Sequence, residues 1–146
     1  MKDLDGRKQI TVGIIGGTGG MGKWFARFFA REGTPVLVSG SKTGPSLAEM
    51  AGACRVVVVS VPIGVTCEVI RQVGPLMKED SLLTDLTSLK AEPVRAMLES
   101  SSSEVIGLHP LFGPGEVSLA EKNVAICPAR GEKWLPWLRG RLEKAG

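Results

Sequence analysis

Short apolar segments alternate with longer amphipathic segments along this chain. The apolar segments have strand length, whereas hydrophobic residues recur every three or four positions in the segments between them. The pattern predicts strands at residues 10–15, 35–39, 55–61, 82–86, 105–108 and 124–127. It predicts helices from the glycine-rich turn to Gly33 and at residues 46–50, 65–73, 93–99 and 132–144. Strands that alternate with helices predict an α/β domain of Rossmann type, with a doubly wound, mostly parallel sheet.

A glycine-rich turn follows the first predicted strand and opens the first predicted helix. It contains a G-x-G-x-x-G pattern, formed by Gly17, Thr18, Gly19, Gly20, Met21 and Gly22. In such a turn the first glycine permits a tight bend, the second lets a pyrophosphate approach the backbone, and the third lets the helix pack closely on the strand. Free N–H groups at the helix start would face the phosphates. Because strand and helix both flank the pattern, we expect these residues to bind a dinucleotide, in preference to an unliganded turn.

The end of the second predicted strand bears on which dinucleotide is bound. NAD-binding units carry an Asp or Glu there, about 20 residues beyond the first glycine, which binds the ribose 2′-hydroxyl. Residues 36–43 read VLVSGSKT and contain no acid. The hydroxyls of Ser39 and Ser41 and the ammonium of Lys42 would favour a 2′-phosphate. The sequence therefore favours NADP, with NAD as the alternative and an ordinary polar turn as the simpler interpretation.

Length and composition restrict the function further. The 146 residues suffice for one domain, and 43% hydrophobic with 23% charged residues is typical of a soluble globular protein. The net charge of +3 is scattered, so nucleic acid is not an expected partner. No segment resembles a signal peptide or a membrane span, and we expect a cytoplasmic protein. The three cysteines, Cys54, Cys67 and Cys127, lack metal-site spacing, so no metal is expected.

Candidate ligand-binding segments lie at the ends of the third and fourth predicted strands, where a doubly wound sheet binds its ligands. Val61 ends the third strand and Pro62 follows it, and Pro62 would shape a turn beside the nucleotide or begin a helix. Residues 85–90, which read DLTSLK, follow the fourth strand and offer a carboxylate, hydroxyls and an ammonium to a substrate beside the nicotinamide. Helix capping by Thr87 or Ser88 is the alternative interpretation.

His109 is the only histidine in the chain and follows the fifth predicted strand. An imidazole with an ordinary pKa of about 6.5 is mostly neutral at pH 7, and it can accept a hydroxyl proton as a hydride leaves. A lone histidine more often has a structural role. The position of His109 at a strand end, beside the predicted cofactor, favours a functional one.

Four segments of the chain resemble prephenate dehydrogenases of tyrosine biosynthesis. They are GGTGGMG at 16–22, VSVPIGV at 59–65, the D-x-x-S-x-K of residues 85–90 and HPLFGP at 109–114. The last two are the specific ones, and the resemblance covers almost the whole chain. It implies an NAD(P)-dependent oxidative decarboxylation of prephenate to 4-hydroxyphenylpyruvate, or the equivalent reaction of its aminated analogue arogenate.

The resemblance also implies residue roles and a domain organisation. His109 matches the family histidine that hydrogen-bonds the substrate hydroxyl and assists its deprotonation, and Ser88 matches the serine that orients this histidine and the substrate. Family members continue into a helical second domain that forms the dimer and contributes arginine to the substrate carboxylates. We therefore expect residues 1–146 to be the nucleotide-binding domain alone, which would act as a homodimer or with the missing helical domain.

Two other functions remain open at this point. Reductases that pass hydride between NADP and a deazaflavin have a similar glycine turn and a Gly-Ser-basic segment, matched here by Gly40, Ser41 and Lys42. A non-catalytic NADP-binding module also fits so short a chain. The sequence also supports two local expectations: the serines at 100–103 form a flexible surface connection, and Trp137, in the last helix, lacks a packing partner within this chain.

Overall fold

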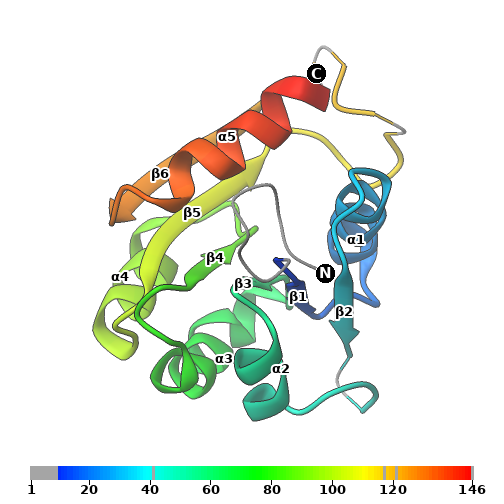
Figure 1. The fold of residues 1–146 in the computed structure, drawn as a ribbon. Coiled ribbons are helices and arrows are strands. Elements are labelled where there is room, and N and C mark those ends of the chain that lie inside the picture. Colours follow the sequence, from blue (N-terminus) through cyan, green and yellow to red (C-terminus); the bar gives the residue numbers. More distant parts are fainter. Residues whose placement is uncertain (1–9, 41, 117, 121, 146) are drawn as a thin grey trace.

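The described residues, 10–40, 42–116, 118–120 and 122–145, form one six-stranded sheet in the computed structural model (Figure 1). The strand order is β2-β1-β3-β4-β5-β6, and all neighbours are parallel except β6, which is antiparallel to β5. The predicted, mostly parallel sheet is therefore confirmed. The strands are β1 (Val12–Ile15), β2 (Val36–Ser39), β3 (Val56–Val59), β4 (Leu82–Asp85), β5 (Glu104–Pro110) and β6 (Val124–Arg130).

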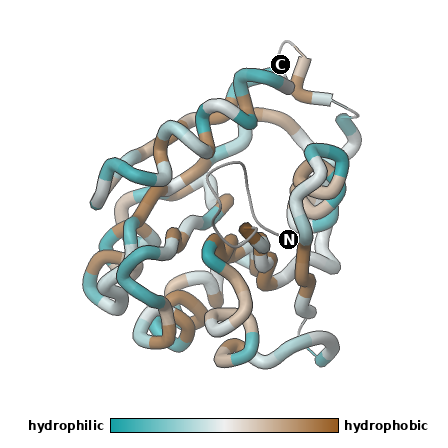
Figure 2. Tube along the Cα trace, viewed as in Figure 1, coloured by the Kyte–Doolittle hydropathy of each residue, from teal (hydrophilic) through white to brown (hydrophobic). Residues whose placement is uncertain are grey.

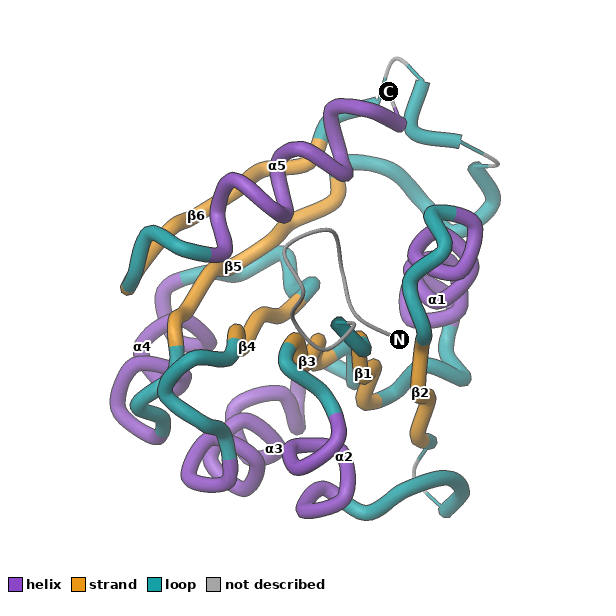
Figure 3. Tube along the Cα trace, in the orientation of Figure 1, coloured by secondary structure: helices purple, strands orange, loops and turns teal. Residues whose placement is uncertain are grey.

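Helices cover both faces of the sheet, as Figures 1 and 3 show. The helices are α1 (Gly20–Arg31), α2 (Leu47–Ala53), α3 (Thr66–Val73), α4 (Ala91–Ser100) and α5 (Trp134–Ala145), with 3-10 turns η1 (Ile63–Val65) and η2 (Gly74–Leu76). Helices α1 and α5 pack on one face of the sheet, and α2, α3 and α4 pack on the other. The sheet is therefore wound on both sides, as the alternation of strands and helices predicts.

The two core layers follow from the composition of these helices. Strands β1 and β3 are buried along their whole length, and Figure 2 shows hydrophobic residues along the central strands. Aromatic residues dominate the layer under α1 and α5, which includes Trp24, Phe25, Phe28, Phe29 and Trp134. The opposite layer contains aliphatic and sulfur-containing residues such as Met50, Ile70, Val73 and Met97. Burial of these apolar side chains is the main favourable contribution to folding.

Strand β5 is longer than the sequence pattern predicts, and this changes the place of His109. The prediction ended the strand at residue 108, whereas the structure continues it to Pro110. The extension forms because β6 pairs with this segment, with Pro110 opposite Val124 and His109 opposite Ala125. His109 therefore lies within a strand and not in the loop after it.

Two local expectations are wrong. Trp137 has a packing partner, because its ring stacks on Phe29 of α1 with centroids 6.0 Å apart. The serine-rich connection between α4 and β5 is held by Arg130 of β6. The Arg130 guanidinium donates hydrogen bonds to the carbonyl oxygens of Ser101 at 2.6 Å and Ser103 at 2.8 Å. Sequence composition alone does not reveal an arginine donor about thirty positions away.

The strand order reverses direction between β1 and β3, and this reversal positions the site. From β1 the chain first adds β2 on one side, and all later strands lie on the other side. In doubly wound sheets a crevice opens at the carboxyl ends of the two strands at such a reversal, and ligands bind there. Just beyond these ends, the backbone N–H of Ser60 donates to the carbonyl oxygen of Ile15 at 2.8 Å. The glycine-rich turn begins at this point.

Candidate functional site

The glycine-rich turn is tightly packed on one side and open on the other. Gly16 has a positive φ of 84°, and a Cβ there would overlap the carbonyl oxygen of Ser60. A Cβ on Gly22 would overlap the carbonyl oxygen of Gly16, so this glycine permits the close approach of α1 to β1. Gly19 is exposed, and its only near neighbour would be the Gly16 oxygen at 3.6 Å. The open side of the turn leaves room for a ligand to reach the backbone.

The start of α1 offers unpaired donors to that open side. Gly19 is the N-cap and supplies no side chain to cap the helix, and the first turn contains no acidic residue. The N–H groups of the first helical residues have no carbonyl partner within the helix. Together with the positive end of the helix dipole, they form a suitable site for a phosphate group. The residues that we predicted for dinucleotide binding, from Gly17 to Gly22, therefore fit a pyrophosphate.

A cavity of about 720 Å³ lies beside this turn. The turn, the loop after β2, the segment after β3 and helix α3 all contribute to its wall. The lining includes Thr18, Gly19, Ser39, Lys42, Val61, Pro62, Val65 and Val69. Among the described lining residues Lys42 is the only charged one. A carboxylate that would repel a 2′-phosphate is thus missing from the described wall, as the sequence predicts.

Several sequence-predicted residues of this wall have clear structural positions. The carbonyl oxygen of Ser39 accepts hydrogen bonds from the backbone N–H groups of Gly16 at 2.8 Å and Gly17 at 3.1 Å, so Ser39 joins β2 to the glycine turn. Its side chain is buried, whereas Lys42 is exposed. Ser41 lies outside the described residues. The wall therefore presents one flexible cation beside a rigid backbone turn.

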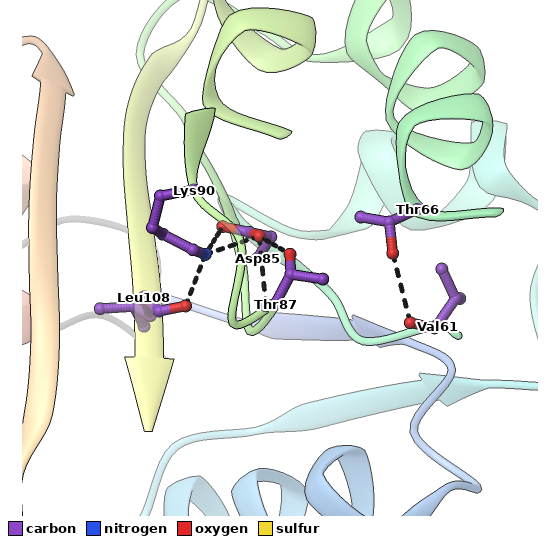
Figure 4. A network of polar contacts seen from close by, with 6 residues as sticks. All are labelled: Val61, Thr66, Asp85, Thr87, Lys90 and Leu108. Atoms are coloured by element: carbon purple, nitrogen blue, oxygen red, sulfur yellow. Dashed lines mark hydrogen bonds and ion pairs between the residues drawn. The ribbon is translucent and has the colours of Figure 1, made fainter. Parts of the chain in front are cut away.

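The segment after β3 is fixed by a threonine that sequence reasoning missed. The buried Thr66 hydroxyl, at the start of α3, donates to the carbonyl oxygen of Val61 at 3.3 Å (Figure 4). It also lies 3.1 Å from the carbonyl oxygen of Pro62. Pro62 precedes η1 as its N-cap residue, which agrees with the predicted helix start, and its role beside a nucleotide stays a prediction. A threonine four or five positions after the segment is the only sequence signal for this contact.

The Asp85 carboxylate, at the end of β4, and the Lys90 ammonium, before α4, bind each other rather than lying free beside a substrate. The Lys90 ammonium lies 2.7 Å from both carboxylate oxygens of Asp85 and 2.6 Å from the carbonyl oxygen of Leu108 (Figure 4). The same carboxylate accepts hydrogen bonds from the backbone and hydroxyl of Thr87. Neither Thr87 nor Ser88 caps α4, because its N-cap residue is Lys90. The capping interpretation of these residues is therefore wrong.

The Asp85–Lys90 ion pair is largely withdrawn from solvent. The side chain of Asp85 is fully buried and that of Lys90 is 17% exposed. Burial lowers the pKa of Lys90 from its ordinary value, and the hydrogen bond and charge of Asp85 oppose that change. A buried ammonium without such a partner would be strongly unfavourable. The carboxylate therefore keeps the cation at this position.

His109 and Ser88 lie on the neighbouring elements β5 and the β4–α4 loop. The His109 side chain is half-buried and Ser88 is exposed. In the described part of the chain no hydrogen bond joins their side chains. The loop after His109 packs on the start of α1: the Phe112 and Trp24 rings are 4.8 Å apart, and the indole N–H of Trp24 donates to the Glu116 carbonyl oxygen at 2.5 Å. The loop thereby links the histidine strand to the helix that begins at the glycine turn.

The described residues offer few other features that bear on function. No group of three or more His, Cys, Asp or Glu residues there could hold a metal ion. No helix among them is long and apolar enough to cross a membrane. Cys54 is buried, and desolvation raises the pKa of its thiol to about 11. This thiol is therefore unreactive at neutral pH.

Comparison with known proteins assigns the family. A family model described as the prephenate dehydrogenase nucleotide-binding domain matches residues 31–146. This chain belongs to that family. The T-protein of Haemophilus influenzae is 37% identical over 130 residues, which cover 89% of this chain and 34% of the T-protein. The "probable arogenate/prephenate dehydrogenase" of Methanocaldococcus jannaschii is 38% identical over 145 residues, covering 88% of this chain and 32% of that protein.

Solved structures of the same family share the fold. The crystal structure of prephenate dehydrogenase from A. aeolicus, in complex with hydroxyphenyl propionate and NAD+, superimposes with a TM-score of 0.76 at 22% identity. The match covers 99% of this chain and 59% of that one. The present chain spans about a third of the length of the two curated relatives named above, with shares of 34% and 32%.

Proposed function

We propose that this domain binds NADP and forms the nucleotide-binding part of an enzyme that oxidatively decarboxylates prephenate or arogenate. The packing of the loop after His109 against the start of α1 carries the proposal. A Cβ on Gly20, in the first turn of α1, would lie 3.1 Å from Pro114 of that loop. The loop after the histidine strand is thus in direct contact with the helix start that carries the proposed pyrophosphate donors. Membership of the prephenate dehydrogenase family supports the same reaction class.

The wall of the cavity supports the cofactor assignment. The open backbone at Gly19 and the first turn of α1 would receive the pyrophosphate. The apolar segment around Val61 and Val65 would contact the adenine, and the exposed Lys42 would lie beside the ribose and its 2′-phosphate. The Ser39 side chain is buried, and a contact of Ser41 with this phosphate stays a prediction from the sequence. Lys42 supplies the positive charge that distinguishes NADP from NAD. A nucleotide held in this way would place its nicotinamide toward the ends of β4 and β5.

The residues of this chain have defined tasks in the proposed reaction. The nicotinamide, when bound, supplies the hydride acceptor. The hydride leaves the ring carbon that bears the hydroxyl, and the neutral imidazole of His109 accepts the hydroxyl proton. Ser88 would orient the substrate hydroxyl and the imidazole. The ring carboxylate then leaves as carbon dioxide, its bonding electrons complete the aromatic ring, and the resulting phenolate oxygen takes the proton back from His109 to give the hydroxyl of the product. Aromatisation supplies the driving force, so the protein need only orient the groups and exclude water.

The rest of the substrate site would come from the part of the family enzymes that this chain does not span. We propose that a helical second domain forms the dimer and binds the substrate carboxylates. The choice between prephenate and arogenate would then depend on that domain, because the two substrates differ at the side-chain end. His109 and Ser88 act on the ring hydroxyl, which both substrates share.

The test separates nucleotide binding from catalysis. We expect His109→Asn to bind NADP as the wild type does and to lose prephenate-dependent NADPH formation, measured with the second domain of a family enzyme supplied. Asn retains a hydrogen-bond donor but cannot accept the proton. Unchanged turnover in His109→Asn would contradict the role of this histidine. Wild-type NADP binding without any turnover would favour a non-catalytic module, and turnover only with a deazaflavin would favour the reductase alternative.

A further inference from the structure

The buried ion pair between Asp85 and Lys90 connects the two elements that carry Ser88 and His109. Asp85 is the last residue of β4, and Lys90 precedes α4. The Lys90 ammonium contacts both carboxylate oxygens of Asp85 and also reaches across to the carbonyl oxygen of Leu108 on β5. Leu108 is the residue directly before His109. Figure 4 shows the ammonium between the carboxylate and this carbonyl. One charged group thus bonds to both elements.

The Asp85 carboxylate also fixes the loop on both sides of Ser88. Its Oδ2 atom accepts hydrogen bonds from the backbone N–H of Thr87, at 3.2 Å, and from the Thr87 hydroxyl. Lys90 holds the same carboxylate from the other end of the loop. Ser88 therefore lies between two residues that share one buried anchor. Its own side chain is exposed and free to face a ligand.

The contact with Leu108 occurs where the backbone ladder between β4 and β5 stops. The last paired residues of this ladder are Asp85 and Gly107. The Leu108 carbonyl lies one residue beyond that pair, and the ammonium supplies its donor at 2.6 Å. Lys90 thus extends the connection between the two strands to the residue before His109. The donor at this point is a side chain, because the paired backbone of β4 has already ended.

Gly107 provides the passage for the Lys90 side chain. A Cβ on Gly107 would lie 3.1 Å from Cδ of Lys90, so the stem of the lysine passes directly over this glycine. His109 is two residues further along the strand, and its side chain projects from the same face. Cys127 of β6 is paired with Gly107, and its thiol is the other titratable group near the ammonium. The Lys90–Asp85 pair and the imidazole therefore occupy one side of the sheet.

We propose that Lys90, held by Asp85, is a positioning residue that fixes Ser88 and His109 relative to each other. The catalytic consequence rests on the proposed function, whereas the coupling between the ion pair and the imidazole can be measured without it. A purely structural ion pair would stabilise the fold and leave kcat unchanged in any variant that still folds. The two roles therefore differ in kcat, whereas the imidazole titration reports whether the charge of the pair acts on His109.

The first experiment uses the single histidine as a probe. Because His109 is the only histidine, its imidazole signals in a proton–carbon NMR spectrum need no assignment. Asp85→Asn removes the carboxylate that compensates Lys90, and we expect the midpoint of the imidazole titration to fall at pH values where the Lys90 ammonium stays charged. The charge-neutral double variant Asp85→Asn/Lys90→Met should return the midpoint to that of the wild type. Arg139→Gln, which breaks an exposed ion pair on α5, is the control and should change nothing.

The second experiment measures catalysis with the helical domain supplied. We expect Lys90→Met to lower kcat about tenfold to a hundredfold, because small displacements of reacting groups have effects of this size. Binding of NADP, which depends on the glycine turn, should stay at the wild-type level. Lys90→Arg should recover part of kcat. If Lys90→Met does not fold, the double variant replaces it, since it leaves no buried charge unpaired.

The results of the two experiments test the role of Lys90 separately from the proposed dehydrogenase reaction. An imidazole titration that is the same in Asp85→Asn and the wild type would overturn the coupling. So would wild-type kcat in a folded Lys90→Met or double variant. If the wild type itself fails to oxidise prephenate or arogenate, the proposed function is wrong, and the NMR experiment still decides whether the ion pair is electrostatically coupled to His109.

Discussion

Removing the charge of Lys42 tests whether the loop after β2 recognises a 2′-phosphate. Lys42 is exposed and is the only charged residue in the described wall of the nucleotide cavity. Two unit charges about 4 Å apart in water attract each other by about 1 kcal/mol, and a phosphate monoester carries a charge of about −1.5 to −2. Salt screening and the entropy of fixing an exposed side chain reduce the net contribution to about 1 kcal/mol.

This free energy corresponds to about fivefold weaker binding of NADP by Lys42→Ala. We expect NAD to bind the variant as it binds the wild type, because NAD carries no 2′-phosphate. Dissociation constants for both nucleotides would be measured by calorimetry or by protection against thermal unfolding. The difference between variant and wild type should shrink as ionic strength rises.

Lys144→Ala, in the last turn of α5, removes the same charge from a distant exposed position and serves as the control. Its NADP affinity should equal that of the wild type. Two results would refute the reasoning. The first is equal stabilisation of the wild type by NADP and NAD, and the second is a loss in Lys42→Ala that is the same for both nucleotides.

Three further predictions concern stability and reactivity. Gly16→Ala should lower the free energy of unfolding by about 2 kcal/mol or more in urea titrations and abolish nucleotide binding. The reason is that the backbone at Gly16 has a positive φ and that a Cβ there would overlap a backbone oxygen. Gly64→Ala is the control, because a Cβ on Gly64 would have no neighbour within 4 Å. Trp137→Ala should destabilise the domain by about 2 kcal/mol, since the stack on Phe29 is lost, and a smaller loss than in Gly64→Ala would contradict that contact. At pH 8 iodoacetamide should modify Cys54 more slowly than Cys67 in mass spectra, because burial raises the pKa of Cys54 to about 11.

The sequence predicts the layers of this fold well because its signals are local. The apolar segments at β1 and β3 and the glycine turn before α1 each lie within one short stretch of chain, and the structure places them as predicted. The antiparallel pairing that lengthens β5 is not local. It joins Pro110 to Val124 across a long connection, so the true position of His109 within a strand could not be predicted from its neighbours.

The same distinction explains what was predicted about the site and what was not. Residues 85–90, which read DLTSLK, contain four polar side chains. The sequence predicts that they face a substrate, with helix capping by Thr87 or Ser88 as the alternative. The structure divides them: Asp85, Thr87 and Lys90 bind one another, and Ser88 alone remains exposed. The division depends on the carbonyl oxygen of Leu108, a backbone atom on another strand. A polar cluster at a strand end therefore contains two kinds of residue, those that meet the ligand and those that hold them in place, and burial separates the two. In this domain the Asp85 carboxylate and the Lys90 ammonium, which from the sequence are candidates for catalysis, form an ion pair with each other.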